Sequence, residues 1–364
     1  MGEGAMGNAD APPRGADYER ALPAADAAPV VFEDERRSPI ARLQRFLHTY
    51  PITVPLIVLG MSVLIFSLLV GKRFYQPYNL SLILQQVTII GIIGIAQTLV
   101  ILTAGIDLSV GAIMVLTSTI MGGVAVHAGV PAELALPLGL CLGILCGSIN
   151  GLLVTAARLP PFIVTLGTWS VFGALNLWYS GSQTIRAQEV ADAAPLLQLT
   201  GTAISVFGAR ITAGTVLMLV LAGVVSYILS HTAFGRHVYA TGDDPEAARL
   251  SGIGTRRVLL AVYALAGLVA AIGSWALIGR VGAISPTSGG GANLDSITAT
   301  VIGGTSLFGG RGSIAGTLVG ALIVGVFRNG LALGGLDALW QEFTVGILII
   351  AAVGVDQWIR RVAQ

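Results

Sequence analysis

Long apolar stretches with almost no charged side chains recur along most of this sequence. Each is close to the roughly 20 residues that an α-helix needs to cross the hydrocarbon core of a bilayer. Those before residue 280 are 52–71, 79–103, 108–127, 133–156, 161–180, 212–231 and 258–279. Three less regular ones follow at 295–309, 313–329 and 337–355, and Gly303 and Gly304 interrupt the first of these. The pattern predicts an all-α, polytopic membrane protein with about ten transmembrane helices, some of them short or broken.

Charged residues are too few for a soluble fold of this size. They make up 11% of the chain, against about 25% in a typical soluble domain. A net charge of +1 also provides no basic field to attract nucleic acid. Soluble enzymes and nucleic-acid-binding proteins are therefore excluded, and membrane lipid is the expected surrounding. Residues 1–45 are polar and lack a hydrophobic period, which predicts a disordered tail ahead of a transmembrane domain over 46–364.

Lysine and arginine are unevenly divided between the two sides of the predicted membrane domain. From Arg42 onward, ten of them lie on the side of the termini and six on the other side. Cytoplasmic loops carry the excess of Lys and Arg, so both termini, and with them the polar tail, are expected in the cytoplasm. The loop 232–257 is then the longest cytoplasmic loop, while 181–211 and 280–294 lie outside.

The sequence contains no catalytic constellation. A phosphate-binding loop needs a lysine after its glycines, and the only lysine, Lys72, stands in Gly71-Lys72-Arg73. Cys141 and Cys146 are five residues apart, hence on different faces of a helix, where they are expected to pack and not to form a disulfide or a metal site. The sequence therefore predicts no catalytic residue, no metal site and no cofactor.

Polar side chains are scattered through the predicted spans. Amides and hydroxyls hydrogen-bond to the hydroxyls of a neutral polyol, and flat aromatic rings cover the apolar face of a sugar. One interpretation is a translocation path for such a substrate, and the alternative is that each polar group joins two helices. The candidates for the path are Gln97, Asn150, Thr165, Thr168, Trp169, Asn176 and Thr300.

Asp107 also has two interpretations. A carboxylate close to membrane depth suggests a gating or coupling role. The same residue comes just before Ser109, at the start of a predicted span. An aspartate there caps the helix by accepting hydrogen bonds from backbone N–H groups. The sequence leaves both interpretations open.

The spacing of glycines supplies two further expectations. Glycines at positions 139, 143, 147 and 151 lie four apart, on one face of a helix, which predicts a groove for a neighbouring helix. The segment Leu102–Gly111 also resembles Leu307–Gly316, with two glycines matched at an offset of 205. Internal duplication is common in transporters, and both segments are expected to be glycine hinges on the cytoplasmic side.

The loop 232–257 contains a short helix with defined end signals. Asp244 is expected at the N-cap and Pro245 at the first helical position. Glu246 follows in the first turn, where the helix dipole favours an acid, and Gly252 ends the helix. A helix of this kind on the cytoplasmic face suits the docking of a soluble partner. The alternative is a solvated linker helix.

Five segments of the sequence stand out together: Leu102–Gly111, Ile149–Leu153, Leu159–Gly167, Gly242–Gly252 and Val301–Gly310. With them the chain resembles, over residues 45–362, the permease subunits of bacterial ATP-binding-cassette importers for monosaccharides, in the ribose and xylose branch. Within that branch the stretches 184–188, 275–280 and 352–360 are similar to fructose import permeases.

The resemblance implies a transport subunit of the bacterial inner membrane that is not itself an enzyme. Its implied partners are an ATPase subunit on the cytoplasmic loops, a second permease copy, and an extracytoplasmic protein that delivers the sugar, fructose before ribose or xylose. Many members of the branch have Gly-Asn where this chain has Gly242-Asp243, a difference that can alter the choice of partner. The residues that carry over to ATPase coupling are Gly242, Asp243, Glu246, Ala247, Ala248, Ser251 and Gly252.

The alternative function is an ion-coupled secondary transporter of a small neutral solute. That mechanism needs an ionisable relay inside the bilayer, and no Asp, Glu, Lys or Arg stands in the middle of the seven regular spans. The sequence therefore favours the ATP-driven importer. Both Glu246 and Ala248 are then expected at the interface with the ATPase.

Overall fold

The computed structural model describes residues 52–360, so the predicted tail over 1–45 lies outside the described residues. Within the described part, eight helical segments are long and apolar enough to cross a membrane. The third of them continues from α5 into the π-helical turn η2 (Gly123–His127). The eight are α3 (Thr53–Val70), α4 (Pro77–Leu102), α5 (Val110–Gly122) with η2, α6 (Ala132–Thr155), α7 (Pro161–Ser180), α10 (Ala213–His231), α13 (Thr255–Val281) and α15 (Ile314–Leu333).

Two further helices account for the remaining predicted spans. α16 (Ala338–Arg360) has 23 residues, whereas α14 (Ala292–Ile302) has only 11 and ends before Gly303. At 1.5 Å per residue α14 covers about 16 Å, roughly half of the hydrocarbon core. The broken helix expected from Gly303 and Gly304 is therefore confirmed. α14 packs on α15 through backbone contact, since a Cβ atom at Gly320 would overlap the carbonyl oxygen of Ala299.

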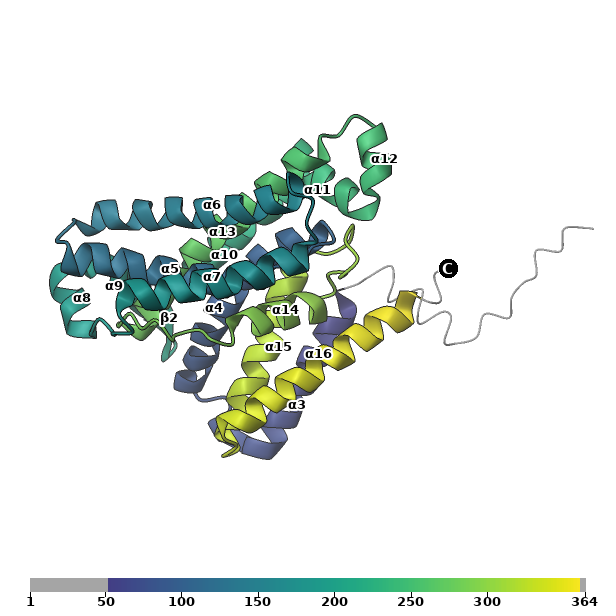
Figure 1. The fold of residues 1–364 in the computed structure, drawn as a ribbon. Coiled ribbons are helices and arrows are strands. Elements are labelled where there is room, and N and C mark those ends of the chain that lie inside the picture. The colour runs from purple at the N-terminus through teal and green to yellow at the C-terminus, as the bar shows by residue number, and fades with distance from the viewer. Residues whose placement is uncertain (1–51, 361–364) are drawn as a thin grey trace, which may run out of the picture. The chain divides into compact units, whose positions relative to one another are not determined.

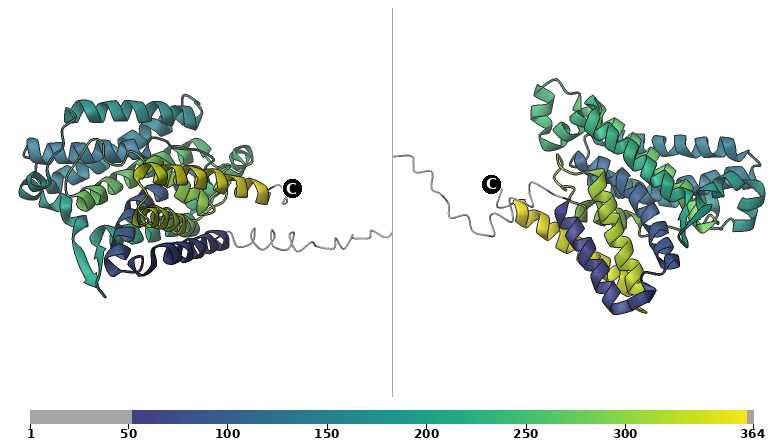
Figure 2. Two further views of the ribbon diagram at one scale, coloured as in Figure 1. Left: turned by 90° about the horizontal axis from the view of Figure 1, so that it is seen from below. Right: turned by 180° about the vertical axis from the view of Figure 1, so that it is seen from behind.

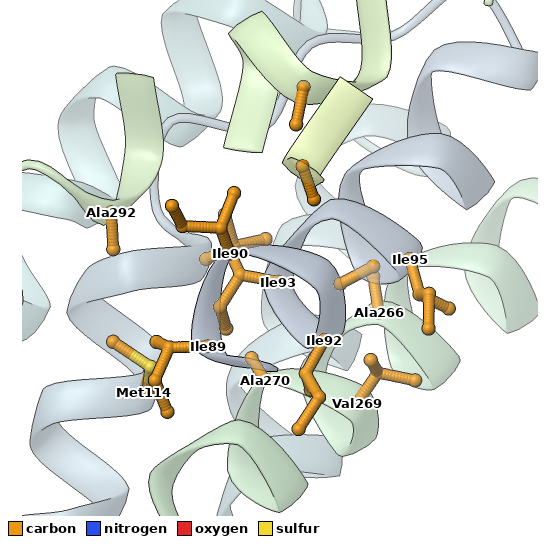
Figure 3. Packing of buried hydrophobic residues seen from close by; sticks show 14 of the residues in the cluster. Ile89, Ile90, Ile92, Ile93, Ile95, Met114, Ala266, Val269, Ala270 and Ala292 are labelled. Atoms are coloured by element: carbon orange, nitrogen blue, oxygen red, sulfur yellow. The ribbon is translucent and has the colours of Figure 1, made fainter. Parts of the chain in front are cut away.

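Helix α4 lies at the centre of the described domain. From Thr88 to Leu102 every residue of α4 is buried, because α5, α13, α14 and α15 all pack against it. Figure 3 shows isoleucines of α4 pointing in different directions, with Met114 of α5, Ala266 of α13 and Ala292 of α14 around them. A helix that is apolar on every side is typical of such a buried position.

The glycine groove predicted on α6 is confirmed, and α13 fills it. A Cβ atom at Gly147 would overlap the carbonyl oxygen of Tyr263, and one at Gly267 would overlap that of Gly143. The two helices therefore touch backbone to backbone, as small residues allow in membranes. Cys146, on the same helix, is buried and Cys141 is exposed, and both are free thiols.

The segment between α7 and α10 departs from the all-α prediction. It contains two short helices, α8 (Ala187–Ala193) and α9 (Pro195–Gln198), and an antiparallel hairpin of β1 (Ala203–Val206) and β2 (Ala209–Thr212). Phe207 and Gly208 form its tip, with φ angles of 48° and 82°, and positive φ at both central residues is typical of the tight hairpin turn. The hairpin has only ten residues and a single aromatic side chain, at its tip. Its alternating pattern of apolar and polar residues is therefore too short to be recognised between apolar spans.

Figures 1 and 2 show two groups of connections on different sides of the domain. At one end lie α8, α9, the hairpin and the loop 282–291, and we call this the hairpin end. At the other end lie α11 (Ala233–Asp243), α12 (Pro245–Leu250) and the loops 103–109 and 303–313, and we call this the α12 end.

Candidate functional site

Three segments that are far apart in the sequence meet at the α12 end. We call the contact of 102–105, 242–243 and 309–312 the loop junction. The N–H of Gly310 donates to the carbonyl oxygen of Leu102 at 3.0 Å, and the hydroxyl of Tyr239 on α11 donates to the carbonyl oxygen of Gly312 at 2.9 Å. A Cβ atom at Gly242 would overlap the oxygen of Leu102. The two segments with matched glycines therefore touch each other, and the end of α11 is packed against both.

The short helix predicted in the loop 232–257 is confirmed as α12, including its end signals. The Asp244 carboxylate accepts hydrogen bonds from the N–H groups of Glu246 and Ala247 at 2.9 and 3.0 Å, and Pro245 occupies the first turn. Gly252 adopts a φ of +84°, the left-handed conformation of a helix C-terminus. The N–H of Ile253 then donates back to the carbonyl of Ala248 at 3.0 Å.

The residues assigned to ATPase coupling divide into two groups. Gly242 and Ala248 are buried inside the chain, Ala248 being 4% exposed. The expectation that Ala248 lies at a partner interface is therefore not met, because its side chain faces the permease itself. The exposed members are Asp243, Glu246, Ala247, Ser251 and Gly252.

Sequence reasoning missed one member of the exposed surface of α12. Leu250 is 82% exposed, beside Arg249, whose guanidinium pairs with Glu246 at 3.2 Å. An isolated apolar side chain on a short polar helix was the signal that could have identified it. We call the exposed residues Asp243, Glu246, Ala247, Leu250 and Ser251 the α12 face.

Asp107 lies in the connection between α4 and α5 and is buried. One oxygen of its carboxylate accepts hydrogen bonds from the N–H and the hydroxyl of Ser109, at 2.7 and 2.6 Å. The amide of Asn150 on α6 donates to the same hydroxyl at 2.7 Å. Burial raises the pKa of the Asp107 carboxyl, and these hydrogen bonds lower it in part. Ser109, and not Asp107, is the N-cap residue of α5, so Asp107 supports the start of α5 by bonding to the residue at its cap. A gating or coupling role for Asp107 stays a prediction.

Two more candidates for the translocation path hold the same connection. The side-chain amide of Gln97 on α4 is oriented so that both its nitrogen and its oxygen form hydrogen bonds. The nitrogen donates to the carbonyl oxygen of Asp107 at 3.0 Å, and the oxygen accepts from the N–H of Asp107 at 3.3 Å. The hydroxyl of Thr165 on α7 donates to the carbonyl of Ile106 at 3.0 Å. Together with Asn150, these residues tie α4, α6 and α7 to the chain around Asp107, which we call the Asp107 network.

The other path candidates are also mostly buried between helices. Thr300 joins α14 to the carbonyl of Gly94 on α4 at 3.2 Å. Thr168 is buried and donates to the carbonyl of Thr165 within α7. Asn176 accepts from Thr119 on α5 at 2.7 Å and donates to the carbonyl of Pro286 at 2.8 Å.

Trp169 differs from the rest, because it is 46% exposed on α7. The six buried candidates, from Gln97 to Thr300, all have hydrogen-bond partners inside the chain. Their arrangement fits the interpretation of polar links between or within helices. Their role in translocation stays a prediction.

The hairpin end is organised differently. A cleft of about 600 Å³ opens between η2, the end of α7 and the start of α8, lined by polar and aromatic side chains that include Tyr179, Gln183 and Arg186. Next to Gly291 of the loop 282–291, Arg328 on α15 pairs with Asp295 on α14 at 2.7 Å and with Glu342 on α16 at 2.9 Å. The three charges link the short helix α14 to both of its neighbours.

Comparison with known proteins identifies the family. The model of a family described as "Branched-chain amino acid transport system / permease component" matches residues 79–353, which includes the loop junction and the Asp107 network. The chain belongs to this family. No solved structure matches the chain.

Several characterised relatives match over most of their length. The fructose import permease protein of Rhizobium meliloti is 52% identical over 347 residues, covering 95% of this chain and 96% of the relative. The ribose import permease protein of Bacillus subtilis is 42% identical, covering 83% and 92%. The xylose transport system permease protein of Escherichia coli K12 is 35% identical, covering 82% and 89%.

Membership in the family confirms several predictions. The chain is a multi-pass permease subunit of an ATP-binding-cassette importer in the inner membrane, and such subunits are not themselves enzymes. Permeases of this kind work with an ATPase subunit and a substrate-binding protein.

Proposed function

We propose that this permease forms the translocation path of an ATP-driven monosaccharide importer, with fructose as its sugar. The observation that carries the proposal is the 52% identity to a fructose import permease over 95% of the chain. Ribose and xylose are the next candidates, since the permeases named for them are less similar. The confirmed helix α12, with its exposed face and capped ends, is consistent with such an importer.

The α12 end is proposed to face the cytoplasm. The excess of Lys and Arg on the side of the termini supports this orientation, and α12 with its neighbouring loops contributes Arg236, Arg249, Arg256, Arg257 and Arg311. The hairpin end then faces outward, where a sugar-binding protein docks. Lipid is proposed to contact the exposed leucines of α3, such as Leu64 and Leu68.

The α12 face is proposed to contact the ATPase. Movement of α12 reaches the permease core through α11, because Gly242 and Tyr239 are packed on the loop junction. That junction includes the end of α4 and the connection from α14 to α15. A displacement of α12 is therefore transmitted to the central helix α4 and to the broken helix α14, with no flexible linker between them.

The decisive experiment is uptake by proteoliposomes that contain this permease, its ATPase and the purified sugar-binding protein. We expect ATP-dependent uptake of radiolabelled fructose that persists when an uncoupler removes the ion gradient. Omitting the ATPase is the control and should abolish uptake. Uptake that continues without the ATPase, or that collapses with the uncoupler at constant ATP, would replace the proposal by ion-coupled transport.

Two further measurements refine the proposal. Competition with unlabelled ribose and xylose ranks the three sugars, and stronger competition by ribose than by fructose would reassign the substrate. We also propose a second permease copy as a partner, which the mass of the solubilised importer tests directly.

A further inference from the structure

One residue in the lining of the cleft at the hairpin end belongs to a set of buried hydrogen bonds. Thr119 of α5 lines the cleft and donates to Asn176 of α7, which in turn donates to the carbonyl of Pro286 at 2.8 Å. These bonds join α5, α7 and the loop 282–291 at this side of the cleft. At about 600 Å³, the cleft falls within the roughly 300–1,000 Å³ of small-molecule sites.

The wall of the cleft is shaped by an unusual helical turn. The turn η2 is π-helical, a rare form that occurs mostly as single turns in α-helices and frequently at functional sites. It begins at Gly123, where a Cβ atom would stand 2.7 Å from the ring of Tyr179. The absence of a side chain at Gly123 therefore lets the ring of Tyr179 lie against the turn and form one side of the cleft.

The chemistry of the lining suits an uncharged polyhydroxy ligand. Amide, imidazole and guanidinium groups are supplied by Gln183, His127 and Arg186, and a carboxylate by Glu189. Among the described residues, the side chains of Gln183 and His127 have no hydrogen-bond partner within the chain. The single positive charge of Arg186 is balanced by Glu189, so the cleft has no excess charge to select an anion such as a sugar phosphate.

We propose that this cleft is an entry site that takes a neutral monosaccharide as the sugar-binding protein releases it. The ring of Tyr179 covers the apolar face of the sugar, while Gln183, Arg186 and Glu189 bind its hydroxyls, the pairing of groups that sugar sites use. The site rests on the proposed function, since it presumes that this importer carries a sugar. None of the residues that line the cleft is a candidate that the sequence suggested for the path, although one such candidate, Asn176, accepts a hydrogen bond from Thr119 in the lining.

The experiment compares Gln183→Ala and Tyr179→Ala with Gln188→Ala in the reconstituted importer. Gln188 is a matched control, because it is an exposed glutamine on α8 whose amide pairs with Asp192 at 2.8 Å and does not line the cleft. We expect the two cleft variants to lower sugar uptake about tenfold at saturating loaded binding protein, the effect of losing one contact worth about 1.4 kcal/mol. Gln188→Ala should transport like the wild type.

A direct measurement separates sugar binding from protein docking. Saturation-transfer NMR with fructose on the permease in nanodiscs should show contact in the wild type and in Gln188→Ala, and none in Tyr179→Ala. The affinity of the binding protein for the permease should be the same in all variants. Weaker docking of the binding protein to Gln183→Ala would overturn the proposal and make the cleft a protein interface.

The results of these experiments also distinguish a failure of the entry site from a failure of the proposed function. If the wild-type importer takes up no monosaccharide, the proposed function fails. If it takes up the sugar and both cleft variants match Gln188→Ala, the proposed function stands and the entry site is wrong.

Discussion

The loop junction and the cleft at the hairpin end are built from different kinds of contact. At the loop junction, glycines bring three segments together backbone to backbone, and the residues of the Asp107 network are buried. The cleft is open and surrounded by exposed polar side chains, although close backbone packing is also found at the hairpin end, where Gly201 lies against Gly279. Backbone contacts leave no room for adjustment, whereas exposed side chains can change rotamer.

This difference suits two tasks. A contact that transmits the movement of one helix to another must be rigid. If the contacting residues could rearrange, the second helix would not move with the first. A surface that receives a ligand needs exchangeable hydrogen bonds and access from solvent. Substitutions should therefore be far more disruptive at the loop junction than at exposed polar side chains of the hairpin end, and the following predictions test that contrast.

The largest effect is expected for Gly242→Val. The new side chain would overlap the carbonyl of Leu102 and force α11 away from α4, which should cost about 3 kcal/mol and abolish coupled transport. Gly173→Ala is the control, because nothing lies within 4 Å of a Cβ atom there. Thermal unfolding of the purified permease measures both, and equal stability of the two variants would refute the close packing of the junction.

Asp107→Ala is expected to destabilise the permease by about 2 kcal/mol, because the buried N–H and hydroxyl of Ser109 lose their acceptor. Asp107→Asn keeps an oxygen at the same place and should retain most of the stability and the transport. This pair separates the two interpretations of Asp107. An asparagine variant that is fully stable yet unable to transport would favour a gating or coupling role for the charge.

Glu246→Lys on the α12 face should lower the affinity of the ATPase about tenfold, equal to about 1.4 kcal/mol, without changing the unfolding temperature of the permease. Ala248→Asp should act differently, since it places a charge at a buried position and destabilises the permease itself. Co-purification and thermal unfolding, measured together, distinguish the two. Normal ATPase binding by Glu246→Lys would count against this face as the docking surface.

The smallest effect is expected at the hairpin end. Glu342 is 52% exposed in its pair with Arg328, so Glu342→Gln should cost less than about 1 kcal/mol. Asp295, bonded to the same guanidinium at 2.7 Å and largely buried, should be more sensitive, and Asp295→Asn serves as the comparison in the same thermal assay. An equal loss in both variants would show that exposure does not decide the strength of these pairs.

Much of the fold was predictable from the sequence because it follows from local rules. The apolar stretches correspond to the helices observed, since the length of a span is set by the bilayer. Asp244, Pro245 and Gly252 mark the ends of α12 because capping depends on residues within one turn. The groove on α6 followed from a repeat of four.

The candidate sites were predictable only in part. Gln97, Asn150 and Thr165 were recognised as polar residues in apolar helices, but their convergence on the chain around Asp107 depends on how α4, α6 and α7 pack. Ala248 was assigned to ATPase coupling because the resemblance carries the whole segment over, and the sequence of a six-residue helix does not tell which side is covered. The cleft around Tyr179 joins segments up to 70 residues apart in numbering, from Thr119 to Glu189, and no local pattern marks it.

The sequence by itself determined that the chain crosses a membrane repeatedly, roughly where its long apolar helices lie, where the short helix α12 begins and ends, and which family it resembles. These properties depend on hydrophobicity, spacing and capping within short windows. Only the tertiary structure decided which glycines touch, that the two matched segments meet at Leu102 and Gly310, and that most polar candidates for the path are bonded to residues of other helices or loops. Such contacts join residues that are distant along the chain, and their geometry is set by the packing of whole helices.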